Sequence, residues 1–301
     1  MRVRRKDGLG KGVLQRTYTD YDRRLESRAN EMGLKRPVMI TTNPFYAAYA
    51  PLDWTGPVTY YGWDEWTALP AVQKWWADLH EAYLRIRARG HRVCAVSQPL
   101  LDTLDPAGPA AVVPNGVDPA EWQAPWAQAP WLKSLPPPRI LYIGAIHSRL
   151  DIEAVRDISR SFPAGSVVFV GHVADAERES QLRSLPNVHL RDPLPRKEIA
   201  GVIRNADVCI MPHLKNDLTK SMSPLKIYEY CAAGRPSAVA DLPPVHGIHR
   251  LVRIVPEGAS FAEMVRQALQ DDPMTEEERQ TFLESNSWSR RHDEILELAM
   301  S

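Results

Sequence analysis

The hydrophobic positions of the chain fall into two blocks of short apolar runs, separated by segments with helical spacing. Short apolar runs bounded by turn residues are typical of buried strands, and their alternation with helical patterns is typical of a parallel α/β sheet. Strands are predicted at 37–42, 58–61, 93–96 and 111–114 in the first block, and at 139–143, 166–171, 188–190, 207–211 and 236–240 in the second. The sequence therefore predicts an α/β protein with two doubly wound, Rossmann-like domains.

The clearest helical pattern runs from about Ala71 to Arg89, where apolar side chains recur at helical spacing and arginines occupy the last turn. Gly90 follows at a capping position, so this helix is expected to pack on the first sheet. In the second block, helices are predicted at 151–161, 175–184, 196–205, 224–233 and 260–270.

A segment without periodicity separates the two blocks. Residues 119–138 are rich in proline, tryptophan and alanine and end in three consecutive prolines, which is typical of an interdomain connection. The predicted organisation is a first domain at 1–122, a linker at 123–138, a second domain at 139–274 and a C-terminal helix at 275–301. The first domain is short, because residues 1–36 are highly charged and helical at best.

Composition excludes several classes of function. The 37 basic and 37 acidic residues cancel, which argues against a polyanionic partner such as DNA. Cys94, Cys209 and Cys231 are far apart in apolar surroundings and are expected to be buried thiols of a reducing compartment, neither a disulfide framework nor a metal cluster. Without an apolar run of spanning length or a signal peptide, a soluble cytoplasmic protein is expected. Its basic start, residues 1–6, leaves peripheral contact with anionic lipid open beside the simpler interpretation of a solvated terminus.

The sharpest local signal is the segment 223–236. Ser223 is expected to cap a helix with Pro224 at its first position, and the amino terminus of such a helix favours an anion. Lys226 in the first turn adds a full positive charge for a phosphate. Glu229, three residues further on the same face, can accept hydrogen bonds from two sugar hydroxyls. The alternative is a capped surface helix with an ordinary Lys–Glu pair.

A second signal follows the first strand of the same block. Gly144 ends the strand and permits close approach of a ligand, and Arg149 can reach a diphosphate just before a helix begins. The three-glycine fingerprint of dinucleotide binding is absent, which argues against an NAD-dependent dehydrogenase. His147 lies between the two residues and is interpreted as a structural loop histidine or, alternatively, a catalyst.

Four segments together resemble family 4 glycosyltransferases of the GT-B type, also called glycosyl transferases group 1. They are residues 112–118, 185–190, 195–212 and 224–236, in the family's order and spacing. A narrower likeness is to teichuronic-acid-type bacterial glycosyltransferases, which have Asn-x-x-Thr followed by Ser-Pro-Leu-Lys. Here these motifs are Asn216 to Thr219 and Ser223 to Lys226.

The resemblance implies two domains facing a cleft, with a UDP- or GDP-linked sugar held by the second domain and a sugar, lipid-linked or small-molecule acceptor held by the first. Transfer would need no cofactor and no obligatory metal. Glu229 would bind the ribose, while Lys226 and Arg149 would stabilise the departing diphosphate. The remaining expected donor-site residues are Gly144, Thr219, Ser223, Pro224 and Leu225. The family has another glutamate eight residues before the position of Glu229. In this sequence that position is Ser221.

In the first block, residues 60–66 resemble an acidic motif of the narrower group. Asp64 and Glu65 follow a strand, where a carboxylate can act as general base or orient the acceptor hydroxyl, so both are predicted catalytic residues. An acidic helix cap is the alternative. Trp63 and Trp66 can stack on a sugar or pack in the core.

The leading hypothesis is a glycosyltransferase of bacterial polysaccharide or glycoconjugate biosynthesis. A non-catalytic nucleotide-sugar-binding or partner subunit is the first alternative, because of Ser221 and because the first domain lacks the strand, glycine-rich loop and helix with which the family opens. That shortage indicates either a start further upstream or a reduced, truncated domain. A nucleotide-sugar epimerase is the second alternative. The family likeness favours retention of configuration, whereas a base at Asp64 favours inversion.

Overall fold

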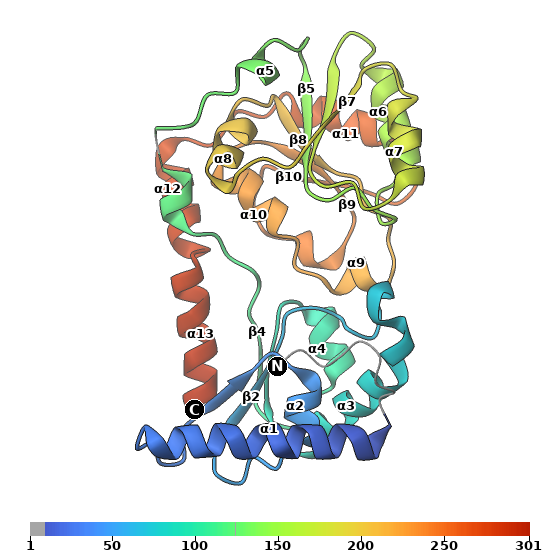
Figure 1. Cartoon of the computed structure of the whole chain (residues 1–301). Coiled ribbons are helices and arrows are strands. Elements are labelled where there is room, and N and C mark those ends of the chain that lie inside the picture. The colour runs from blue at the N-terminus through green and yellow to red at the C-terminus, as the bar shows by residue number, and fades with distance from the viewer. Residues whose placement is uncertain (1–9, 124) are drawn as a thin grey trace. The chain divides into compact units, whose positions relative to one another are not determined.

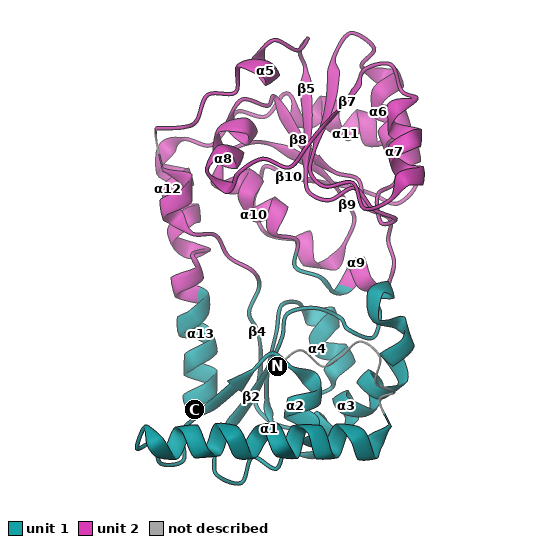
Figure 2. Cartoon of the chain, in the orientation of Figure 1, with its two compact units in different colours: residues 1–114, 221–223, 291–301 teal, residues 115–220, 224–290 magenta. Residues whose placement is uncertain are grey.

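The computed structural model describes residues 10–123 and 125–301, which form two compact units (Figures 1 and 2). The first unit comprises the chain up to Pro114 together with residues 221–223 and 291–301, and the second comprises residues 115–220 and 224–290. Residues 1–6, to which the lipid-contact hypothesis refers, lie outside the described residues. In the described part of the chain, no helix is both long and apolar enough to cross a bilayer.

Unit 1 is built on a parallel sheet of four strands in the order β1-β2-β3-β4. Its strands are β1 (Met39–Thr41), β2 (Val58–Gly62), β3 (Arg92–Ala95) and β4 (Ala110–Val112), joined through α2 (Pro44–Tyr49), η1 (Pro70–Trp75) with α3 (Trp76–Ala88), and α4 (Gln98–Leu104). All four predicted strands are present. The order runs in one direction, unlike the doubly wound sheet expected, because no strand pairs on the other side of β1 among the described residues.

Right-handed crossovers in a sheet that grows in one direction place their helices on the same face. The core on that face includes Tyr60 of β2, Val93 of β3 and Ile86 of the predicted helix α3. The helix is confirmed, although it begins as a 3₁₀ turn with a non-helical Val72. Cys94 and Ile295 belong to a second, smaller hydrophobic cluster. The C-terminal part of α13 (Trp288–Met300) therefore contributes to unit 1.

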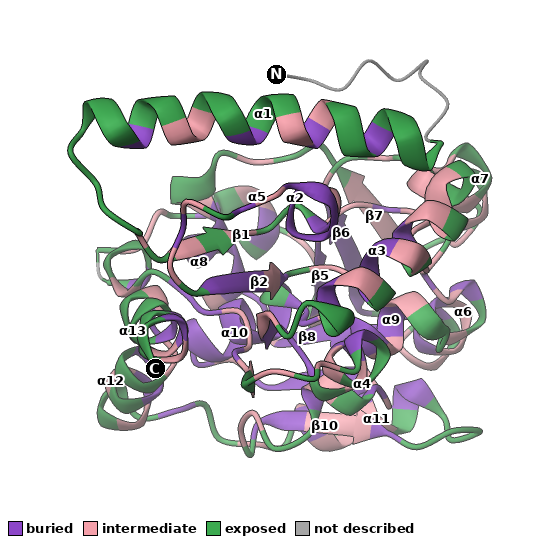
Figure 3. Ribbon diagram, turned by 90° about the horizontal axis from the view of Figure 1, so that it is seen from below, coloured by how far each residue is buried: buried purple, intermediate pink, exposed green. Residues whose placement is uncertain are grey.

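The charged N-terminal segment forms one helix, α1 (Lys11–Glu31). Buried positions recur along one side of it (Figure 3) and include Asp22. The Asp22 carboxylate accepts hydrogen bonds from the Tyr46 hydroxyl at 2.7 Å, the Leu52 N–H at 3.0 Å and the Trp54 Nε1–H at 3.1 Å. A buried charge is tolerated when several donors satisfy it, so these bonds fix α1 on the α2 segment.

Unit 2 contains a parallel sheet of six strands in the order β10-β9-β8-β5-β6-β7, which is the doubly wound arrangement that the sequence predicts. The strands are β5 (Arg139–Ile143), β6 (Ser166–Val170), β7 (Val188–Arg191), β8 (Val208–Met211), β9 (Ser237–Ala240) and β10 (Val252–Val255). Five of them were predicted, and β10 is additional. Cys209 and Cys231 lie buried in this unit as free thiols, as expected, and Cys94 does so in unit 1.

Helices cover both faces of the second sheet. One face packs against α6 (Ile152–Ser161), α7 (Ala176–Arg183) and α11 (Phe261–Ala268), and the other against α8 (Arg196–Arg204), α10 (Leu225–Ala232) and α12 (Glu276–Ser285). The short elements of the unit include η2 (Pro119–Trp122), α5 (Pro130–Lys133) and η3 (Pro243–Val245). The expected single C-terminal helix is two helices. The helical backbone is interrupted between α12 and α13, where Ser287 forms a β-bridge with Val117.

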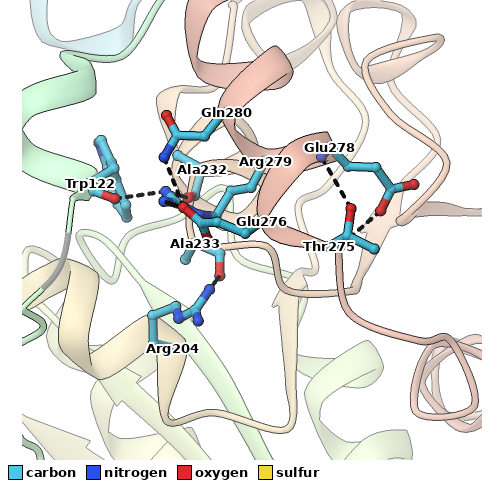
Figure 4. Close-up of polar contacts among 9 residues, drawn as sticks. All are labelled: Trp122, Arg204, Ala232, Ala233, Thr275, Glu276, Glu278, Arg279 and Gln280. Atoms are coloured by element: carbon cyan, nitrogen blue, oxygen red, sulfur yellow. Dashed lines mark hydrogen bonds and ion pairs between the residues drawn. The ribbon is translucent and has the colours of Figure 1, made fainter.

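A buried arginine holds the carboxyl end of α10 (Figure 4). Arg279 of α12 is 2% exposed, and its Nη1 donates to the carbonyl oxygens of Trp122 at 2.7 Å and Ala232 at 3.2 Å. Its charge is balanced by Glu276, whose Oε2 accepts from Nε at 2.9 Å. Arg204 donates to the next carbonyl, that of Ala233, at 3.1 Å. Positive charge at this end satisfies the last carbonyls and the helix dipole, and so fixes the helix that carries the candidate site.

Replacing Arg279 by leucine is expected to lower the free energy of unfolding by about 3 kcal/mol, because two buried carbonyls and one carboxylate lose their donor. Thermal and urea unfolding would measure the change. Arg250→Leu is the matched control: Arg250 is half exposed and pairs with Glu278 at 3.0 Å, so its loss should cost less than about 1 kcal/mol. Equal costs for the two variants would contradict the proposed anchoring.

Candidate functional site

Several predicted donor-site residues meet at the carboxyl ends of β5 and β8, where the strand order of unit 2 reverses. Gly144 follows β5, and His213 lies two residues after β8. Lys226 of α10 reaches the same place: a Cβ built on Gly144 would lie 3.2 Å from the Lys226 Nζ. Ligands of doubly wound sheets bind at this switch point, so the fold itself marks the position.

The Lys226 ammonium lies among neutral partners. The side chain is 9% exposed, and its Nζ lies 3.2 Å from the Tyr142 Oη and 3.4 Å from the His213 Nε2. Burial, with the nearby Arg149 guanidinium, lowers the pKa of Lys226 to about 7. Within residues 10–123 and 125–301, neither Lys226 nor Arg149 forms an ion pair. Two adjacent cations, neither of them ion-paired with a carboxylate in the described part of the chain, favour an anionic ligand.

Two buried donors at the site have no protein acceptor. The Arg149 Nε and the His213 Nδ1 are both buried without a hydrogen-bond partner among the described residues. Burial lowers the pKa of His213 well below its usual value, with the Lys226 and Arg149 charges adding to the effect. Buried polar atoms without partners are rare in native proteins, and such atoms beside two cations are consistent with an oxyanion ligand.

Glu229 has a partner that the sequence did not reveal. Its carboxylate is 8% exposed and pairs with the Arg196 Nη1, while the Arg196 Nη2 pairs with Glu121 at 2.8 Å. These two carboxylates raise the pKa of Arg196, although burial opposes them. Arg196 is the first residue of α8. Its position at the start of a predicted helix that follows a strand is the signal by which the sequence could have marked it as a site residue.

The loop before α10 differs from expectation. The helix begins at Leu225 with Pro224 at the N-cap position and no side chain capping it, so the Ser223 cap is not formed. Ser223 groups with unit 1, and Leu225 is 45% exposed. Thr219 is fully buried, and its hydroxyl donates to the Leu214 carbonyl at 2.7 Å. Its geometry is that of a residue that holds the loop.

Thr219 also explains the Asn-x-x-Thr motif locally. The Asn216 Oδ1 accepts from the Thr219 N–H at 2.9 Å, and the Thr219 Oγ1 accepts from the Asn216 N–H at 2.9 Å. This reciprocal pair resembles a capping box and starts α9 (Asp217–Ser221). The motif therefore shapes the loop between β8 and α10.

The two predicted catalytic carboxylates in unit 1 have different environments. Both follow β2, but Glu65 is 3% exposed, and its Oε1 accepts from the Thr67 N–H at 2.8 Å and from the Thr67 hydroxyl at 2.5 Å. Asp64 is half-buried, and its Oδ1 accepts from the Glu65 N–H at 3.0 Å. Glu65 thus closes a turn, and Asp64 is the carboxylate of the pair that reaches solvent.

The nearby tryptophans pack on one another. Trp63 is 48% exposed, and its ring meets that of Trp66 edge to face at 5.4 Å. The backbone N–H of Trp66 donates to the Tyr83 hydroxyl at 3.2 Å, and Trp66 is less exposed than Trp63. Trp63 therefore offers the accessible aromatic face beside Asp64.

Comparison with known proteins matches the second half of the chain to an enzyme family. Residues 137–271 fit the family described as glycosyl transferases group 1. A protein of Bacillus subtilis (strain 168), named as a teichuronic acid biosynthesis glycosyltransferase, TuaH, is 31% identical over 105 residues. That alignment covers 34% of this chain and spans about a quarter of the relative, 26% of its length.

Solved structures with low identity share the fold over nearly the whole chain. Sucrose-phosphate synthase from Thermosynechococcus elongatus has a TM-score of 0.71 at 14% identity, covering 97% of this chain and 79% of that one. The α,α-trehalose 6-phosphate synthase from Burkholderia multivorans has a TM-score of 0.70 at 11% identity, covering 94% and 75%. A third similar structure, from E. coli, is described as bound with UDP-2-fluoro glucose (TM-score 0.65, 14% identity, covering 94% and 78%). The expected α/β fold of the GT-B type is confirmed, and residues 137–271 carry a domain of the glycosyl transferases group 1 family.

Proposed function

We propose that this chain is a glycosyltransferase that binds a nucleotide diphosphate sugar at the switch point of unit 2 and transfers the sugar to an acceptor bound by unit 1. The observation that carries the proposal is the pair of cations formed by buried Lys226 and half-buried Arg149, neither of which forms an ion pair among the described residues. A hexosyl donor linked to UDP or GDP fits this site, and bacterial polysaccharide or glycoconjugate synthesis fits the family.

The proposed chemistry is electrostatic. When the bond from the anomeric carbon to the diphosphate breaks, negative charge develops on the leaving oxygen. Lys226 and Arg149 would stabilise that charge, since preorganised cations do so without reorganising solvent. We propose that these side chains make a metal ion dispensable. Glu229 is positioned by Arg196 and would accept hydrogen bonds from the ribose hydroxyls.

The test is transfer or hydrolysis with UDP-, GDP- and dTDP-linked radiolabelled sugars, with lipid-linked, sugar and small-molecule acceptors, in the presence and absence of EDTA. Turnover of one donor that persists in EDTA supports the proposal. Binding of a nucleotide sugar without turnover would identify the chain as a non-catalytic subunit, and interconversion of donors without an acceptor would identify an epimerase. Loss of turnover in EDTA would overturn the metal-independent part.

Asp64 is the proposed acceptor-side base. Asp64→Asn should lower kcat by at least about 100-fold while leaving the KM for the donor unchanged, since general-base catalysis is worth that factor or more. Steady-state kinetics with the donor that the panel of labelled sugars identifies would measure both constants. Inversion at the anomeric carbon is the expected outcome if Asp64 deprotonates the attacking hydroxyl.

Two control variants separate this role from structure. Asp53→Asn changes an exposed carboxylate of the same unit and should leave kcat unchanged. Glu65→Gln preserves an acceptor for Thr67 and should affect unfolding temperature more than kcat. Retention of most of kcat in Asp64→Asn would exclude Asp64 as the base.

A further inference from the structure

Two side chains outside the predicted donor set surround Lys226. The Tyr142 Oη donates to the Ala145 carbonyl at 3.1 Å, which commits its proton and leaves its lone pairs for the Lys226 Nζ at 3.2 Å. The same Nζ lies 4.5 Å from the centre of the Tyr142 ring. Tyr142 therefore offers both a hydroxyl acceptor and an aromatic face to the ammonium.

His213 completes this arrangement from the other side. Its Nε2 lies 3.4 Å from the Lys226 Nζ and 3.2 Å from the Tyr142 Oη. Burial lowers the pKa of His213, so the ring is neutral and its Nε2 can accept a hydrogen bond from Lys226 when the proton is on Nδ1. Lys226 is thus held between two neutral acceptors, each fully or almost fully buried.

The charges around Lys226 do not balance without a ligand. Arg149 and His147 approach from the loop after β5, and Glu229 lies on the same helix as Lys226. The Glu229 carboxylate already pairs with Arg196. Neutral Tyr142 and His213 add no negative charge. A diphosphate would bring the missing negative charge and stabilise the ammonium form of Lys226.

We propose that Tyr142 and His213 are positioning residues that hold Lys226 at the diphosphate site, and that binding of a nucleotide sugar is coupled to protonation of the Lys226 amine. The inference rests on the proposed function, since it concerns the same site. On binding, a proton from the solvent adds to the Lys226 amine, and the resulting ammonium pairs with a phosphate oxygen. Affinity then falls by about tenfold for each pH unit above neutral, because the amine must be protonated first.

The experiment is titration calorimetry of the full chain with UDP-glucose and GDP-mannose, repeated in buffers of different ionisation enthalpy. The doubly esterified diphosphate of these donors does not titrate near neutral pH, so any linked proton belongs to the protein. Uptake should approach one proton at about pH 8.5, about half a proton near pH 7 and little at about pH 5.5.

Variants of the two positioning residues give a readout that a structural role would not move. Tyr142→Phe keeps the ring but removes the acceptor, and His213→Leu removes the other acceptor; each should move the pH midpoint of binding down by about 1–2 units. His213→Gln restores a neutral acceptor and should return the midpoint toward that of the unaltered chain. His189→Gln, on β7 in the same unit, is the matched control and should change nothing.

Three results of these binding experiments would contradict one or both proposals. Tight binding without proton uptake at about pH 8.5 would overturn the inference and leave the proposed function standing. Equal weakening of Tyr142→Phe and His213→Leu at every pH, with an unchanged midpoint, would overturn the positioning role. Failure of both donors to bind, followed by failure of the wider donor panel, would overturn the proposed function and this inference together.

Discussion

A Lys226→Met variant is expected to bind nucleotide sugar at least about 100-fold more weakly than the unaltered chain, since a charge-assisted bond to phosphate is worth roughly 3 kcal/mol. Its unfolding temperature should be unchanged or higher. Methionine matches the length of the lysine side chain and can be buried without desolvating a charge, whereas Lys226 is 9% exposed and has no carboxylate partner among the residues that the structure describes. Loss of binding with retained stability would separate function from folding.

The pH dependence of stability provides an independent check on the same variant. The pKa of Lys226 is about 7 in the folded chain and about 10.5 for an ordinary lysine, so the unfolded state binds more protons between these values. The free energy of unfolding should therefore gain a rising contribution as pH increases through this window. Lys226→Met should lack that contribution, which urea unfolding at several pH values would measure.

Lys220→Met is the matched control for Lys226→Met. Lys220 belongs to the same unit, and its side chain is 42% exposed and pairs with a neighbour on its own helix, Asp217, at 3.8 Å. Its loss should change neither nucleotide affinity nor the pH profile of stability. Equal affinity of Lys226→Met and the unaltered chain would exclude Lys226 from the diphosphate site.

The strand pattern of the sequence predicted most of the fold, and the elements that were missed or only partly recognised have physical explanations. β10 was not predicted because Arg253 interrupts its apolar run, and the structure shows this side chain paired with Asp271 at the edge of the sheet. The helix α1 was only partly recognised because Asp22 interrupts its buried stripe. Its burial depends on donors from a different segment, residues 46–54, which spacing along the chain does not reveal.

The candidate site was predictable only where a residue carries its own signal. Lys226 and Glu229 lie on a well-marked helix, and Gly144 follows a clear strand. Tyr142 and His213 carry no such mark: one is an apolar-looking strand residue, and the other a lone histidine after a strand. Their relevance comes from the adjacency of β5 and β8, which are separated by two further strands in sequence. Pairing across the switch point is a tertiary property.

A Gly171→Ala variant is expected to lose about 2–5 kcal/mol of unfolding free energy, combining backbone strain with overpacking. Gly171 follows β6 with a φ of 155°, and a Cβ there would lie 2.2 Å from the Gly144 carbonyl oxygen and 2.6 Å from its carbonyl carbon. Both are backbone atoms, so no side chain can move aside. The loop at Gly144 must shift, and nucleotide affinity should fall with stability.

The matched control for Gly171→Ala is Gly247→Ala, which isolates the steric part of the effect. Gly247 also has a positive φ, 73°, but nothing lies within 4 Å of a Cβ built there. Its substitution should cost only the strain of a left-handed alanine, about 1 kcal/mol, and leave nucleotide binding intact. If Gly171→Ala kept full affinity while losing stability, the backbone at Gly144 would not contact the ligand, and the diphosphate would have to be held by the side chains of Lys226 and Arg149 alone.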